Sequence, residues 1–143
     1  MSAPNLNAIE ARALVPSGDF EQSKRFYQAI GFTMEWASAD MASFRCGPTG
    51  FLLQKFYVPD HANNFVMSLL VEDVDAWWER VSGAATEFGL TVEKPADRPW
   101  GLRDFPLIDP SGALWRPEVM VSSAAAGTVP ASAGSRPTYR RRT

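Results

Sequence analysis

Hydrophobic and polar positions follow the same order in two successive stretches of the chain. In the first stretch, residues 8–15 have the apolar content of a strand, and apolar positions between 20 and 30 recur at helical spacing. Three short strands are then predicted at residues 32–38, 41–46 and 51–57. The pattern therefore predicts the element order βαβββ.

The second stretch repeats this order. Residues 65–71 predict a strand, and the next helix carries Val74, Trp77, Trp78 and Val81 at positions i, i+3, i+4 and i+7. This spacing places the four side chains on one face, where a tryptophan pair is more typical of a core than of a ligand site. Further strands are predicted around residues 91–92, at 103–108 and at 113–120. The two stretches therefore indicate an internal repeat.

Local signals mark the ends of these elements. Asp19 is predicted to cap the first helix, and the pair Glu72 and Asp73 to cap the second. Gly31 follows the first helix, where a positive φ is often needed. Residues 109–112, with the sequence DPSG, predict a type I turn before the last strand.

A change in composition separates a predicted domain from a predicted tail. Residues 121–143 are rich in Ala, Ser, Gly, Pro and Thr, with little to bury, so we expect a disordered C-terminal tail. The compact domain is expected to span residues 8–120, with modules at about 8–57 and 65–120.

Charge and hydropathy exclude several kinds of partner. The net charge is −2, but residues 1–120 hold 10 basic against 16 acidic side chains, a balance of −6. Such a domain repels nucleic acid and attracts cationic ligands, and the four arginines after residue 135 are too few to reverse this. No apolar run is long enough to cross a membrane, and the N-terminus lacks a secretory signal pattern. We expect a cytoplasmic protein without a membrane or nucleic-acid partner.

Single reactive side chains have a structural explanation that competes with a catalytic one. Cys46 lies in an apolar alternation, so a core position is favoured over a nucleophile. His61, the one histidine, lies in a polar stretch beside a single carboxylate, so a solvated loop is favoured over a metal ligand or a general base. We therefore predict no catalytic residue.

Three segments resemble a known superfamily. Residues 18–32 (GDFEQSKRFYQAIGF) and 71–75 (VEDVD) resemble the helix starts of the vicinal-oxygen-chelate superfamily, which contains glyoxalase I, extradiol dioxygenases, fosfomycin-resistance enzymes and bleomycin-resistance proteins. Residues 98–105 (RPWGLRDF) with the DPSG turn look most like the metal-free bleomycin-resistance branch. The resemblance implies an α+β fold in which two βαβββ modules form curved half-barrel sheets.

The resemblance also implies where a metal would be held. Catalytic members bind a divalent ion with two histidines and two glutamates on inner strand positions, and those positions correspond here to Arg12, Gln54, Val66 and Arg116. We therefore expect no metal and no other cofactor. Glu118 could share the inner face with Arg116, so a weak site for a hard cation stays open.

These observations predict a metal-free small-molecule binding protein that forms a homodimer. A bleomycin-type or other cationic aromatic antibiotic is the candidate ligand, with antibiotic resistance as the role. The alternatives are a glyoxalase- or dioxygenase-like metalloenzyme with an atypical site, and an assembly partner whose groove is filled by side chains. The residues expected to bind the ligand are Trp36, Phe44, Gln54, Phe56, Trp100, Arg103 and Arg116.

Overall fold

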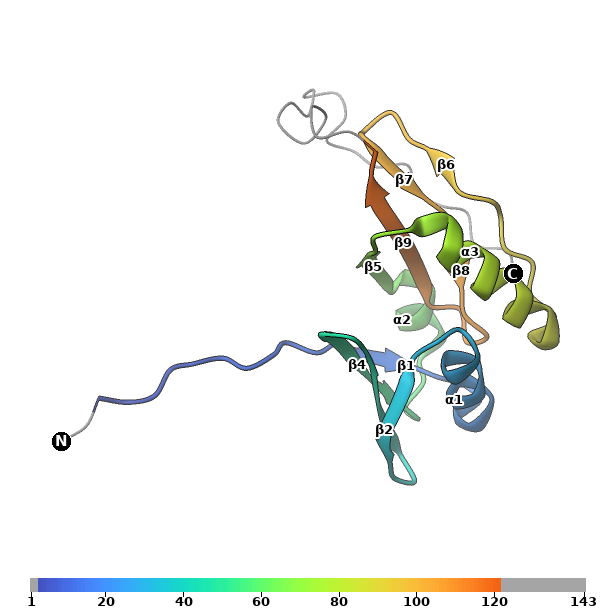
Figure 1. Cartoon of the computed structure of the whole chain (residues 1–143). Coiled ribbons are helices and arrows are strands. Elements are labelled where there is room, and N and C mark those ends of the chain that lie inside the picture. The colour runs from blue at the N-terminus through green and yellow to red at the C-terminus, as the bar shows by residue number, and fades with distance from the viewer. Residues whose placement is uncertain (1–2, 122–143) are drawn as a thin grey trace.

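The computed structural model describes residues 3–121, which form two sheets with a helix packed against each (Figure 1). The first sheet has the strand order β1-β4-β3-β2, with β1 parallel to β4 and the other pairs antiparallel. Its helix, α1, comprises Phe20–Ala29. The strands of this sheet are β1 (Leu14–Pro16), β2 (Thr33–Ala37), β3 (Met41–Cys46) and β4 (Thr49–Gln54).

The second sheet has the order β5-β9-β7-β6, and β8 also pairs with β9. Again the first strand is parallel to the last, β5 to β9. Its helix, α3 (Val74–Ala85), ends in the short 3-10 helix η1 (Thr86–Phe88). The strands are β5 (Val66–Leu70), β6 (Ala96–Asp97), β7 (Leu102–Asp104), β8 (Leu107–Ile108) and β9 (Leu114–Met120).

The predicted helix signals are confirmed. Asp19 accepts a hydrogen bond from Gln22 N at 3.1 Å, and Asp73 accepts one from Ala76 N at 3.0 Å. Gly31 has a φ of +117°, which favours glycine after a helix. The same cap in both helices is consistent with a repeated unit.

Several predicted boundaries are wrong. The first strand begins at Leu14, and the chain before it leads into an N-terminal arm whose first part extends away from the domain (Figure 1). No strand forms around residues 91–92, because the pairing with β7 is made by Ala96 and Asp97 instead. The predicted strand 103–108 is divided at Pro106, and the linker before β5 contains a short helix, α2 (Pro59–Asn64). His61 is exposed on this helix.

The core between sheets and helices is aromatic and joins both halves of the chain. Tyr27 of α1 and Phe51 of β4 are both fully buried, and their ring centroids lie 5.7 and 5.1 Å from that of Trp115 in β9. Trp77 packs at 6.1 Å from Phe32, as its predicted core position requires. Cys46 is half-buried against the same core. Much of the aromatic content is therefore used in packing.

A buried polar cluster crosses the same boundary. The Tyr27 hydroxyl donates to Asp109 Oδ2 and accepts from Trp115 Nε1 at 2.8 Å. The other Asp109 oxygen accepts from the backbone N–H of Ser111 and of Ala113, each at 2.9 Å. Asp109 thereby fixes the predicted turn before β9, and Gly112 closes it with a φ of +97°. Burial raises the pKa of Asp109 to about 6.

No helix within residues 3–121 is long and apolar enough to cross a membrane. The predicted disordered tail, beyond Val121, lies outside the described residues.

Candidate ligand-binding site

Each sheet has one face packed against α1 and α3 and one face turned away from them, which we call the inner face. Side chains alternate between the two faces along a strand. In β9, Trp115 and Val119 belong to the core, so Arg116 and Glu118 lie on the inner face. In β4, Phe51 and Leu53 are fully buried, so Gln54 lies on the inner face of the first sheet.

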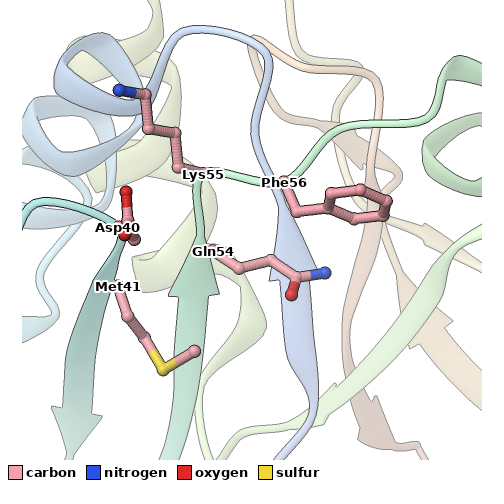
Figure 2. A pocket seen from close by; sticks show the side chains of 5 residues that line it. All are labelled: Asp40, Met41, Gln54, Lys55 and Phe56. Atoms are coloured by element: carbon pink, nitrogen blue, oxygen red, sulfur yellow. The ribbon is translucent and has the colours of Figure 1, made fainter.

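A hollow of about 380 Å³ lies at the end of β4, lined by Asp40, Met41, Gln54, Lys55 and Phe56 (Figure 2). Met41 and Gln54 are paired across β3 and β4, and Lys55 N donates to Asp40 O at 2.9 Å. Gln54 and Phe56 extend to one side of the chain and Lys55 to the other (Figure 2). Phe56 is 68% exposed. An accessible ring beside an amide group can bind a planar or cationic molecule.

The opposite end of this sheet carries an ion-pair network. Arg45 donates to both carboxylate oxygens of Glu10, at 2.9 and 2.7 Å, and to Glu35 at 3.3 Å. These bonds, with Glu10 the larger cause, raise the pKa of Arg45. Arg12 lies 3.6 Å from Glu10. Arg12 is thus part of this ion-pair network, and it precedes β1, which begins at Leu14.

On the inner face of the second sheet, Ser68 of β5 stands beside Arg116 and donates to the buried carboxylate of Glu118. Three apolar side chains on the same strands are exposed there: Val66, Leu70 and Met120, at 50, 68 and 48%. The face therefore combines a polar centre with an apolar rim.

Strand register corrects the predicted correspondence between the two sheets. Pro16 and Leu70 each stand three residues before the cap of the following helix, so they are equivalent. Pro16 pairs with Gln54, whereas Leu70 pairs with Glu118. Gln54 therefore corresponds to Glu118, and not to Arg116.

The residues present do not fit a divalent metal. Within residues 3–121, no three histidine, cysteine or acidic side chains lie close enough to hold one. Arg12 is a cation, Val66 has no donor atom, and Gln54 offers one neutral oxygen. Glu118 is a suitable ligand, but its hydroxyl neighbour Ser68 adds no negative charge.

Two of the predicted ligand residues lie away from the inner face. Phe44 is 1% exposed and stacks on Phe51 with centroids 5.4 Å apart, so its ring belongs to the core. Arg103 lies on the helix side of β7, where it pairs with Asp75 at 2.8 Å and Asp97 at 3.1 Å. These carboxylates raise the pKa of Arg103, and Arg103 lowers that of Asp75. We leave both residues out of the site.

The other predicted residues are partly accessible. Trp36 pairs with Ser43 after a bulge in β2 and is 47% exposed. Trp100 is half-buried at the turn between β6 and β7, and its indole N–H has no hydrogen-bond partner among residues 3–121. Gln54 and Phe56 share the hollow, whereas Arg116 lies on the second sheet. Their role in binding stays a prediction.

Sequence reasoning missed three residues of the hollow: Asp40, Met41 and Lys55. Met41 is the first residue of a predicted strand and Asp40 lies just before it, with no signal in the sequence that they would meet the end of β4. Only the antiparallel register, which pairs Met41 with Gln54, brings them there.

Comparisons with known proteins agree on the fold. A family model for the Glyoxalase/Bleomycin resistance protein/Dioxygenase superfamily matches residues 9–116. No curated protein sequence matches the chain significantly. A solved bleomycin-binding protein complexed with bleomycin is similar with a TM-score of 0.66 and 23% identity, over 77% of this chain and 97% of that chain.

Two further solved structures are similar over most of their length. A bleomycin-binding protein from bleomycin-producing Streptomyces verticillus, complexed with copper(II)-bleomycin, has a TM-score of 0.65 and 20% identity, covering 83% of this chain and 100% of that one. Lactoylglutathione lyase from Agrobacterium tumefaciens has a TM-score of 0.59 and 18% identity, covering 77% and 92%. At these identities the likeness concerns the fold, and the predicted α+β fold with curved sheets is confirmed.

Proposed function

Because this chain belongs to the glyoxalase/bleomycin resistance protein/dioxygenase superfamily, we propose that it binds a small organic molecule on its inner face without a resident divalent metal. The observation that supports this most is the hollow beside Gln54, in which the ring of Phe56 is 68% exposed. Exposure of a large aromatic ring to water has a free-energy cost, which a partner that covers the ring removes. A ligand that stacks on Phe56 would remove that cost.

The ligand we propose is cationic and aromatic. Asp40 and Lys55 both line the hollow, so their charges offset there, and it is the net charge of −6 over residues 1–120 that attracts cations. Rings attract both planar groups and cations. Two of the similar structures are bleomycin-binding proteins, so bleomycin-type glycopeptides are the first candidates and sequestration of such an antibiotic is the role we propose.

The proposal is tested by titrating wild type, Phe56→Ala and Trp100→Ala with bleomycin and simpler cationic aromatics, following tryptophan fluorescence and melting temperature. Since a stacked cation contributes about 0.5 to 2 kcal/mol, we expect Phe56→Ala to weaken binding roughly 2- to 30-fold. Trp100→Ala should weaken binding while it changes the melting temperature of the free protein little. Val58→Ala is the matched control, because Val58 is 40% exposed nearby and does not line the hollow.

The outcomes separate three readings. Equal affinities of wild type and Phe56→Ala would place the ligand elsewhere. No binding of any of these compounds would contradict the cationic aromatic class. Tightly held stoichiometric metal, with turnover of a dicarbonyl or a catechol, would favour the metalloenzyme instead.

A further inference from the structure

Arg116 differs from the other basic side chains that form no ion pair within residues 3–121. It is half-buried in the middle strand of the second sheet. The others are exposed to solvent: Arg25, Lys55, Arg80 and Lys94. Water can solvate an exposed cation, whereas a guanidinium that is partly removed from water needs another partner.

The side chain of Arg116 lacks a direct hydrogen-bond or ion-pair partner within residues 3–121. Its Nε–H is buried and has no hydrogen-bond partner in the part of the chain that the structure describes. Glu118 lies two residues along the same face and accepts from Ser68, and Arg116 is in none of the ion pairs within residues 3–121. A buried donor left without an acceptor is destabilising, so such a group needs an explanation. The two Nη groups of the same guanidinium are not buried, so a ligand can supply acceptors to them.

The surroundings of Arg116 define what else the ligand must have. Val66 and Leu70 of β5 and Met120 of β9 are about half or more exposed on the same face. Three exposed apolar side chains on one face favour a ligand with an apolar part that covers them. The guanidinium favours a carboxylate, because its N–H groups can bind two oxygens at once.

We infer that Arg116 is the anchor of a second subsite, which takes a carboxylate group of an organic ligand whose apolar part lies on Val66, Leu70 and Met120. The inference rests on the proposed function only in placing the ligand on the inner face. It is independent of the hollow at Phe56, which lies on the other sheet.

The test follows the arginine Nε–H signals of ¹⁵N-labelled full-length protein by NMR during titration with benzoate. The Arg116 signal is identified by its loss in Arg116→Lys. We expect this signal to shift in a saturable way with benzoate, and not with benzyl alcohol, which has the ring without the charge. Arg116→Gln should weaken benzoate binding about tenfold or more, because a charge-assisted hydrogen bond is lost.

Arg103→Lys is the matched control, since Arg103 is also in a strand but is paired with Asp75 on the opposite face. It should leave benzoate binding unchanged. Circular dichroism of each variant checks the fold. Unchanged benzoate affinity in folded Arg116→Gln, or an equal response to benzyl alcohol, would overturn the inference. So would an equal response to sulfate at the same ionic strength, which would show an anion site without recognition of an organic body.

The two proposals fail separately. Bleomycin binding without a benzoate response at Arg116 would remove the carboxylate subsite and leave the proposed function. A benzoate response without binding of any cationic aromatic would do the reverse.

Discussion

At Asp109, one carboxyl group holds two parts of the molecule that are far apart in sequence. It accepts the Tyr27 hydroxyl of α1 and two amides of its own turn, and it is 2% exposed. Burial raises its pKa to about 6, and these hydrogen bonds oppose that rise. The folded protein therefore holds a proton on this group more tightly than the unfolded chain does.

This predicts a pH dependence of stability. Because the folded pKa lies above the unfolded value of 3.8, the stabilisation is fully present below pH 3.8 and is lost as the pH rises through 6. The free energy of unfolding of wild type should fall by up to about 3 kcal/mol from this group between pH 4 and pH 7. Urea denaturation across this range measures it. Asp109→Asn should remove that part of the slope, and an identical slope in both proteins would contradict the prediction.

Phe44 and Arg103 show what a sequence pattern can and cannot predict about the site. The alternation of β3 shows which residues share a face with Phe44, but not which face meets the helices. Phe44 was therefore assigned to the ligand, although it stacks on Phe51 in the core. Arg103 is likewise predicted to bind the ligand, because nothing in its local sequence reveals its ion pair with Asp75 of α3.

Both long helices, α1 and α3, are capped at the N-terminus by an aspartate side chain. Asp73 accepts a hydrogen bond from Ala76 N, which satisfies one of the unpaired amides at the start of α3. We expect Asp73→Ala to lower the free energy of unfolding by about 1 kcal/mol, measured by urea denaturation with tryptophan fluorescence. Asp73→Asn keeps the acceptor and should lose little. An equal loss in the two variants would show that charge, and not the cap, stabilises the helix.

Helices were predicted more accurately than strands because their signals are local. The caps Asp19 and Asp73 and the glycine after α1 lie within a few residues of the ends that they define. Strand ends depend on partners elsewhere in the chain. The strand expected at residues 91–92 is absent because the hairpin turn at Gly101 pairs Ala96 with Asp104.

For the whole molecule, we predict a homodimer. Leu6 and Ile9 of the N-terminal arm are 86 and 99% exposed. Apolar surface of this kind marks interfaces, and two-fold dimers are the commonest closed assembly. Sedimentation velocity at tens of micromolar should give a dimer, and Ile9→Glu should shift it toward monomer. Arg25→Glu, on the exposed side of α1, is the control; a wild-type monomer would contradict the prediction.

The aromatic core has a consequence for the order in which the protein can be made. Tyr27 and Phe51 pack against Trp115, which belongs to the last strand of the second sheet. A ribosome delivers the N-terminal half first, and contacts between distant residues form slowly. The first sheet must therefore wait, with part of its apolar face uncovered, until β9 has left the ribosomal exit tunnel. Productive folding is thus expected only once β9 is accessible, and a nascent chain stalled before Trp115 should be the form that chaperones bind.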